Sequence, residues 1–489
     1  MRRVLAALLC LMLVAAGVSA SAEEPSAASA TGAGEVFAIP AGDGRSMLIG
    51  YDGTELTGRS DYALLYQISD DECPPERRLF AGSPVRVGTG PADEEGYTTY
   101  ALIDATGRRL TDAIYGDLTH RWRSGIVTFY QGDLMGALDE RGNVLLEAKY
   151  GGIVPDGEGG YLVTPEESFV YDRDGYAYVA RLYRMAPDGA MTDTGVTTVP
   201  YLYGQLSDGL LAVTTQVGKE WLTGYVNARG EFEIEPQFDG ADAFRDGYAT
   251  ARLPGGGLTG LLRPDGSWAI EPSYDAISDT WSGAASICAV RGKSVDILDR
   301  KTLKVIASYS FPKAGYVYAY EMNARAITVG ADSNISVYGM DGKLLFSLPE
   351  KAGAYVNGSF SASEGVPERL ILTAGEWPTY RTYIVDYALK KIAGPFRELS
   401  ALWWRDGEGR YMAMDYEIQN GADGPSVDYD TYRYGLIDQD GSVLLPTVYE
   451  QLMYLGGDRY WVKYADVYGV VDEAGAWYFQ ASEYEELMD

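Results

Sequence analysis

Histidine is almost absent from this chain of 489 residues, whose only copy is His120 in the segment GDLTHRWRSG. One imidazole cannot form a histidine-rich zinc site, and a Ser-His-Asp or Cys-His mechanism would have to depend on it. The sequence also has no G-x-S-x-G, H-E-x-x-H or Walker-type motif. Because His120 lies in a variable connection of the repeat described below, we expect it to have a surface or packing role.

Cysteine is also scarce, and one of the three cysteines, Cys10, falls in a leader segment. The other two, Cys73 and Cys288, make no disulfide framework, so a hydrophobic core must provide the stability. Cys288 lies in the small, apolar stretch AASICAVRG and is predicted to be buried. Cys73 lies in DDECPPERR, where two prolines bar ladder pairing and the charges need water, so it is predicted to be accessible. About five repeat units separate the two cysteines, so no bond between them is expected.

Basic residues are outnumbered, because 40 Lys and Arg stand against 70 Asp and Glu, for a formal net charge of −30. Loss of Arg2 and Arg3 with the leader would leave 38 against 70, or −32. A chain this acidic repels phosphate backbones, which argues against nucleic acids and anionic lipids as partners. The ordinary consequence of such a charge is solubility.

Long hydrophobic runs occur only at the start of the chain. Residues 1–22 combine a basic pair, an apolar stretch and a small-residue site, which predicts a secretory signal peptide cleaved after Ala22. Leu9 stands where a lipobox needs a small residue, so no lipid is expected on Cys10. Residues 23–35 should form a flexible linker. No later segment approaches about 18 consecutive apolar residues, so the mature chain is predicted to be secreted, or cell-envelope associated, without entering a membrane.

A repeat dominates the rest of the sequence. A glycine is followed eight residues later by an aromatic residue, and three residues after that usually by an aliphatic one. The clearest copies lie in 100–153, 223–294 and 433–479, and MLIGYDGTEL (47–56) is a candidate for the first. The glycine and aromatic pairs are Gly107 and Tyr115, Gly142 and Tyr150, Gly230 and Phe238, Gly266 and Tyr274, and Gly441 and Tyr449. The residues three further on are Leu118, Ile153, Ala241, Ile277 and Leu452.

Each unit is predicted to contain three or four short strands joined by turns. In TGLLRPDGSWAIE, apolar-rich runs flank a PDG turn, where glycine supplies the positive φ that a hairpin demands. Asp or Asn at the turn start can accept a hydrogen bond from the backbone two residues on. Residues 36–489 are therefore predicted to form one all-β domain of about ten tandem repeats of ~36 residues, arranged like a propeller. An open β-solenoid and two smaller rings are the alternatives.

The unit resembles the WG repeat of bacterial proteins, most closely in GYVNARGEFEIEPQFDGA (224–241), GLLRPDGSWAIEPSYDAI (260–277) and GLIDQDGSVLLPTVYEQL (435–452). The Trp-Gly pair that names the family is absent, since Thr223, Thr259 and Tyr434 stand in the tryptophan position of these copies. The resemblance implies an exported or envelope-attached protein with no general catalytic residues and a binding role. It does not specify a partner.

The sequence alone does not bring acidic, metal-binding or aromatic residues together into one defined site. Acidic pairs suit a glycosidase, but almost every repeat has Asp and Glu at its turns, so no pair stands out. The segments DRDG (172–175) and DQDG (438–441) resemble parts of calcium loops without the remaining ligands, so neither a metal nor another cofactor is expected. The adjacent Trp403 and Trp404 in SALWWRDG would point to opposite faces of a strand, which makes them a candidate aromatic binding platform.

The sequence thus favours a secreted, non-catalytic repeat protein that offers a recognition surface for a protein or a glycan at the bacterial envelope. A polysaccharide hydrolase with a carboxylate pair and a structural spacer protein are the alternatives. A single deep cleft holding two facing carboxylates would favour the hydrolase.

Overall fold

The computed structural model describes most of the chain from residue 35 onward. The described ranges are 35–41, 45–59, 61–70, 73–84, 98–202, 204–278, 285–322, 326–331, 334–339, 341–348, 354–358, 369–374, 378–386, 391–405, 408–421 and 424–482. The expected signal peptide and nearly all of the expected linker lie outside these residues. Within them no helix is long and apolar enough to cross a membrane.

Strands make up nearly all the regular structure, which confirms the all-β prediction. Two short 3₁₀ helices, η1 (Pro75–Arg77) and η2 (Glu166–Ser168), are the helical elements of the described residues. The strands form nine sheets, and in most of them consecutive strands of the chain pair as antiparallel neighbours. The eight-stranded second sheet departs from this rule, because β12 pairs with β10, β11 and β13.

The first four sheets cover the first half of the chain. They comprise β1 (Val36–Ala41), β2 (Arg45–Gly50), β3 (Tyr62–Gln67), β4 (Leu79–Pro84) and β5 (Ala101–Asp104); then β6 (Gly116–Arg121), β7 (Ile126–Gln131), β8 (Leu134–Asp139), β9 (Val144–Pro155), β10 (Tyr161–Pro165), β11 (Val170–Tyr171), β12 (Ala177–Met185) and β13 (Met191–Thr198); then β14 (Leu210–Val217), β15 (Glu220–Asn227) and β16 (Phe232–Phe238); then β17 (Gly240–Ala241), β18 (Ala249–Arg252), β19 (Thr259–Leu262) and β20 (Trp268–Tyr274).

The other five sheets have four strands each. They comprise β21 (Ala276–Ile277), β22 (Ser286–Arg291), β23 (Ser294–Asp299) and β24 (Val305–Ser310); then β25 (Val317–Met322), β26 (Ala326–Ala331), β27 (Asn334–Gly339) and β28 (Leu344–Leu348); then β29 (Ala354–Gly358), β30 (Arg369–Ala374), β31 (Arg381–Asp386) and β32 (Lys391–Phe396); then β33 (Glu398–Arg405), β34 (Glu408–Gly421), β35 (Gly424–Asp438) and β36 (Val443–Tyr449); then β37 (Gln451–Gly456), β38 (Arg459–Tyr464), β39 (Val467–Val471) and β40 (Trp477–Ser482).

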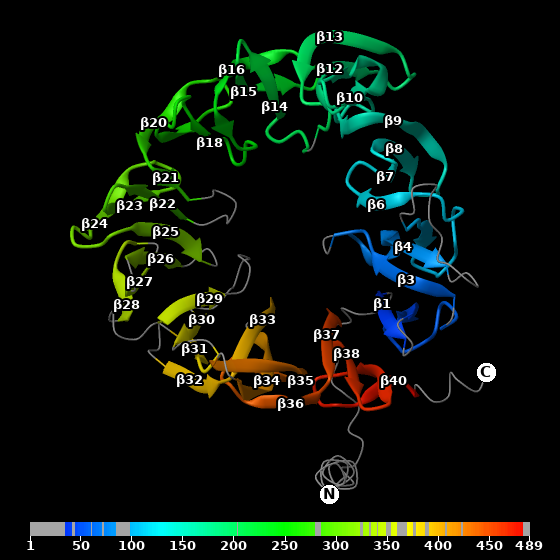
Figure 1. Cartoon of the computed structure of the whole chain (residues 1–489), viewed down its shortest axis with the longest axis vertical. Coiled ribbons are helices and arrows are strands. Elements are labelled where there is room, and N and C mark those ends of the chain that lie inside the picture. The colour runs from blue at the N-terminus through cyan, green and yellow to red at the C-terminus, as the bar shows by residue number, and fades with distance from the viewer. Residues whose placement is uncertain are drawn as a thin grey trace, which may run out of the picture.

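The sheets follow one another around a single ring, and the first lies beside the last (Figure 1). The first sheet holds two repeat turns, at Gly53 and Gly107, and the second holds three, at Gly142, Gly175 and Gly189. Buried apolar clusters join neighbouring sheets face to face, as propeller blades pack. The propeller-like prediction is confirmed, with more units than the usual ~8 blades.

One contact recurs between units. The turn glycine of a unit packs against the last strand of the unit before it, so closely that a Cβ there would meet that strand. Gly107 faces Leu56, Gly142 faces Leu110 and Thr111, Gly230 faces Thr194, Gly266 faces Ile234, Gly342 faces Ala307, Gly441 faces Ala393, and Gly475 faces Leu445. The glycine therefore does two things, since it supplies the positive φ of the turn and lets the neighbouring unit approach.

The ring closes through the same contact. A Cβ on Gly53, in the segment proposed as the first copy, would lie 2.1 Å from the carbonyl oxygen of Tyr478 on β40. The Tyr51 hydroxyl donates to Asp458 Oδ1 at 2.6 Å, and the Arg459 guanidinium lies 4.0 Å from the Tyr51 ring centre. A buried cluster with Phe37, Met47, Trp461 and Tyr468 seals the junction. The last sheet has four strands of its own, so closure is by packing and not by strand exchange.

A second glycine of the repeat lies inside the unit, where two neighbouring strands come close together. In four copies this glycine lies opposite a bulge in the next strand of the chain, where two extra residues of that strand crowd against it. A Cβ would come within 2.5–2.8 Å of a carbonyl oxygen of that strand in every case. The four glycines are Gly136, Gly224, Gly260 and Gly435. The residue before each of them pairs with the repeat's aromatic residue, as Thr223 does with Phe238.

The five repeat aromatics occupy equivalent places in their units, each in one cluster with its aliphatic partner. Tyr115, Phe238 and Tyr274 are buried, whereas Tyr150 and Tyr449 are half-buried. All five turn glycines have φ between +78° and +87°.

The prediction for one cysteine is confirmed, and the prediction for the other is wrong. Both thiols are free and both are buried, as expected for Cys288. The expectation that Cys73 is accessible is wrong, because the residue is only 1% exposed. Pro74 and Pro75 do not extend a strand here; Pro74 is the N-cap of the 3₁₀ helix η1 and Pro75 is its first residue, directly after the buried cysteine. Burial raises the pKa of the Cys73 thiol, which keeps it protonated at neutral pH.

Candidate functional site

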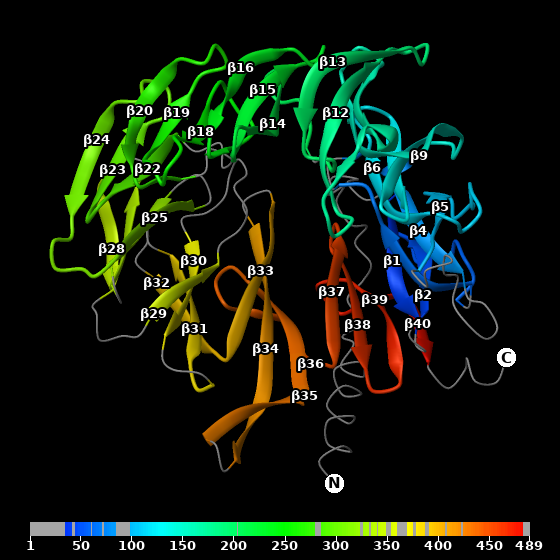
Figure 2. The ribbon, with the colours of Figure 1, turned by 45° about the horizontal axis from the view of Figure 1, so that its top comes forward.

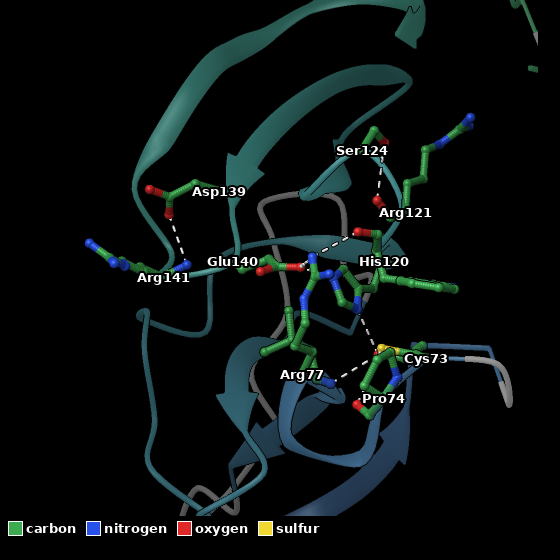
Figure 3. Close-up of polar contacts among 12 residues, drawn as sticks. Cys73, Pro74, Arg77, His120, Arg121, Ser124, Asp139, Glu140 and Arg141 are labelled. Atoms are coloured by element: carbon green, nitrogen blue, oxygen red, sulfur yellow. Dashed lines mark hydrogen bonds and ion pairs between the residues drawn. The ribbon is translucent and has the colours of Figure 1, made fainter. Parts of the chain in front are cut away.

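The single histidine is the centre of a polar network between the first two sheets. His120, on β6, has its Nδ1 2.7 Å from Ser69 Oγ and its Nε2 2.9 Å from Glu140 Oε1. Arg77, from η1, donates to the same Glu140 oxygen at 2.5 Å. Figure 3 shows Arg77, His120 and Glu140 converging, with Cys73 beside the imidazole. Residues from four separate segments therefore meet here.

The hydrogen bonds fix the tautomer of the imidazole. The ionised Glu140 can only accept, so Nε2 of His120 carries the proton and donates to it. Nδ1 of the neutral imidazole is then the acceptor for the hydroxyl of Ser69, whose oxygen also accepts the backbone N–H of Leu79 at 2.9 Å. Burial lowers the pKa of His120, and Arg77 adds to this effect, against the raising influence of Glu140. Burial alone would raise the pKa of Glu140, but hydrogen bonds from Arg77 and His120 outweigh it and hold that pKa below its usual value.

The order serine, histidine, carboxylate matches a hydrolase triad, yet the surroundings favour a structural role. The His120 imidazole has no exposed surface, and Ser69 is buried beneath it. Ser69 does not line the neighbouring cleft, so a substrate there would not reach its hydroxyl. The network joins η1 to the β6 and β8 strands, in agreement with the expected packing role of His120.

A cleft of about 520 Å³ opens beside this network and is lined by residues from the first three sheets and their connections. Arg121, Trp122 and Arg123 supply one wall from the turn after β6, and the loops after β9 and before β14 supply the others. Arg121 donates to the carbonyl oxygen of Gly204 at 3.1 Å, and burial lowers its pKa. The Arg123 guanidinium lies 4.7 Å from the centre of the Trp122 ring. This wall of the cleft is thus basic and aromatic, in a chain that is strongly acidic.

Two carboxylates reach this cleft, and both are already engaged. Asp70 accepts the indole N–H of Trp122 at 3.0 Å. Asp156 is buried and accepts two backbone N–H groups on one oxygen and Arg184, at 3.0 Å, on the other. A glycosidase needs one carboxyl group that can donate a proton and a second that can attack or activate water. This pair does not offer that arrangement.

A second hollow, of about 450 Å³, lies on the β34–β35 hairpin. Both strands are about twice as long as those of most units, and the hairpin extends beyond the edge of the ring (Figure 2). The lining residues are Tyr429, Asp430, Tyr432, Arg433, Tyr434, Glu450 and Gln451. Three tyrosines and four planar polar groups therefore share one surface hollow.

The proposed platform of Trp403 and Trp404 has another explanation for its first member. Trp403 is half-buried, and its indole N–H donates to the Tyr460 hydroxyl at 2.8 Å. Its ring lies 5.9 Å from that of Tyr454, and the Arg410 guanidinium lies 5.0 Å from its centre. Trp403 thus packs between the last two sheets. The side chain of Trp404 lies outside the described residues.

The suspected calcium fragments are turns. In each, the first aspartate accepts two backbone N–H groups within its own turn, at 2.9 Å for Asp172 and 2.8 Å for Asp438. Over the described ranges, no group of three His, Cys, Asp or Glu side chains could hold a metal ion.

The sequence interpretation missed Ser69, Arg77 and Glu140, because they reach His120 only through tertiary packing. The tyrosines of the second hollow could have been identified from their spacing in the sequence. In the segment DYDTYRYG (428–435), tyrosine recurs at short intervals next to charged residues.

The comparisons agree with the repeat. The family model described as "WG containing repeat" matches residues 224–255 and 434–468. No curated protein matches the chain. Among solved structures, a eukaryotic initiation factor is 12% identical, covering 64% of this chain and 85% of its own, with a TM-score of 0.38. The β-propeller domain of Cps50 (Swd1) from Myceliophteria thermophila is 13% identical, covering 64% of this chain and 96% of its own, with a TM-score of 0.25. The C-terminal WD40 domain of Sif2 is 11% identical, covering 65% of this chain and 91% of its own, with a TM-score of 0.27.

These scores are too low to support an argument, so the fold rests on the strand pairing and the packing between sheets described above. The repeat rests on the glycine and aromatic spacing together with the two matched segments. The chain therefore contains WG repeats, which the family model matches at residues 224–255 and 434–468.

Proposed function

We propose that this protein is an exported, non-catalytic recognition protein that binds a protein or a glycan at a bacterial cell envelope. The observation that carries the proposal is the cleft of about 520 Å³ that is lined from three successive sheets. Recognition surfaces of repeat proteins are commonly built from several successive units. The leader over residues 1–22 supports export.

The lining of the cleft supports binding more than catalysis. Arg and Trp are the residue types that most often dominate binding energy at protein interfaces. Arg123 is exposed at the rim and Trp122 lies against it. Both cleft carboxylates are held by hydrogen bonds, which supports recognition over the hydrolase alternative. The basic wall favours ligands with carboxylate or other electron-rich oxygen groups.

The test is a binding measurement with matched charge reversals. Envelope fractions are passed over the immobilised protein, and the captured protein or glycan is purified and titrated against Arg123→Glu and Arg173→Glu. Arg173 is an exposed arginine on the distant DRDG turn and serves as the control. We expect Arg123→Glu to weaken binding by about tenfold or more and Arg173→Glu to leave it unchanged. Equal affinities of both variants, no saturable ligand, or release of reducing sugar from polysaccharides would contradict the proposal.

Export has its own test. Mass spectrometry of the mature protein should find an N-terminus near Glu23 and no lipid on Cys10. A diacylated Cys10 or an intact leader in the mature protein would contradict it.

A further inference from the structure

The tyrosines of the β34–β35 hairpin form a stack with one closed end and one open end. At the closed end the Arg397 guanidinium lies 5.2 Å from the centre of the Tyr416 ring. Tyr416 stacks on Tyr432 at 4.8 Å between ring centres, with 26° between the planes. Tyr432 stacks on Tyr429 at 5.9 Å and 1°. We call Arg397, Tyr416, Tyr432 and Tyr429 the tyrosine ladder.

Exposure rises along the tyrosine ladder. Tyr416 is 4% exposed, Tyr432 is intermediate, and Tyr429 is 70% exposed. The inner members therefore hold Tyr429 in place while its outer face meets water. A ring that is stacked on one side and open to solvent on the other can receive a flat ligand.

Four polar groups surround the exposed ring in the hollow of about 450 Å³. Asp430, Glu450 and Gln451 provide planar acceptors and donors, and Arg433 is held by the backbone carbonyl oxygens of Asp430 and Tyr432. A sugar ring has an apolar face of C–H bonds that stacks on an aromatic ring and a rim of hydroxyls that pair with such planar groups. A few placed polar groups beside apolar rings are the usual composition of a ligand site.

We propose that the tyrosine ladder binds a neutral polysaccharide, with one sugar ring stacked on Tyr429 and its hydroxyls bonded to Asp430, Glu450 and Gln451. This inference rests on the proposed recognition function and assigns a second site, distant in sequence from the cleft. The formal net charge of −30, and two carboxylates in the hollow, disfavour an anionic polymer.

A quaternary ammonium ligand is the main competitor, since tyrosines and carboxylates also form cation-binding cages. A cage needs rings that face inward around one centre. Here successive rings lie within 26° of parallel in an offset stack, and Tyr429 is the most exposed of them. The stacked geometry therefore favours a flat ligand on the end of the ladder over an enclosed cation.

The experiment titrates the full-length mature protein by calorimetry with neutral β-linked hexasaccharides of glucose, N-acetylglucosamine, mannose and xylose, and with choline and polygalacturonate. The variants are Tyr429→Ala, Tyr429→Phe and the control Tyr176→Ala, which removes a tyrosine of 74% exposure on another turn. At least one neutral hexasaccharide should bind saturably. Tyr429→Ala should weaken that binding by about tenfold or more, while Tyr429→Phe and Tyr176→Ala stay within about twofold.

The proposal is overturned if no neutral hexasaccharide binds, if Tyr429→Ala binds as the wild type does, or if choline or polygalacturonate is preferred. Thermal unfolding of Tyr429→Ala should match the wild type, because the ring is mostly solvated. The Arg123→Glu experiment concerns a different surface, so loss of glycan binding here leaves the cleft proposal standing, and the reverse also holds.

Discussion

His120 gives this protein a pH response that can be isolated, because no second histidine titrates in the same range. In the folded state the imidazole is fully buried, and burial lowers its pKa below 6.5. The unfolded chain therefore binds a proton at pH values where the folded chain does not. The stabilising contribution of neutral His120 is complete above about pH 7 and is lost as the pH falls through 6.5 toward the folded-state pKa.

The magnitude follows from a single proton. One proton bound by the unfolded state alone changes the free energy of unfolding by at most about 1.4 kcal/mol per pH unit. His120→Gln removes this proton while its amide can still donate to Glu140 and accept from Ser69. We expect the wild type to lose stability relative to His120→Gln between pH 7.5 and 5.5, by about 1 kcal/mol.

The assay is urea unfolding of both proteins at several pH values, followed by circular dichroism. All carboxylates and the N-terminal amine are shared, so they cancel in the difference between the two proteins. Parallel pH dependences would refute the burial argument. A wild type that gains stability on acidification would show that the imidazole is charged and paired with Glu140.

Three further predictions follow from packing. Gly53→Ala should destabilise the protein in urea unfolding by roughly 1–3 kcal/mol more than Gly175→Ala does. Both residues have φ near +88°, but only Gly53 faces another chain segment, so equal losses of stability would contradict the closure contact. Phe238→Ala should lower the free energy of unfolding by about 3–5 kcal/mol. Tyr449→Ala should lower it less, because Phe238 is buried and Tyr449 is half-buried, and the reverse order would contradict the burial assignment. Both buried cysteines should react with a thiol reagent only on unfolding, so rapid labelling of the native protein would refute their burial.

The all-β class and the repeat could be predicted because they depend on local chemistry. Turn glycines and turn aspartates act within a few residues, so their spacing is visible in the sequence. Gly107 and Asp104, for example, form one turn by short-range hydrogen bonds. The equivalence of Tyr115 and Phe238 follows from the same spacing.

The missed features depend on contacts between distant segments. The environment of His120 needs η1 and β8 to meet β6, and no local pattern encodes that meeting. The burial of Cys73 was not predicted because the charges around it were expected to require water, whereas the neighbouring Arg77 pairs with Glu140 and the carbonyl oxygen of Trp122 from distant segments. Choosing one ring over two rings or a solenoid needs the contact of Gly53 with Tyr478, which are at opposite ends of the chain.

The central claim is that the repeats close into one ring by packing the first sheet on the last. The most direct test places a photo-cross-linking phenylalanine analogue at position 51, whose tyrosine touches Asp458 and Arg459. Irradiation followed by mass spectrometry should join residue 51 to the segment 456–459 within the same molecule, and the analogue at position 176 should give no such product. If the monomer forms no link between these segments, or forms it only between two molecules, the chain is not a closed ring.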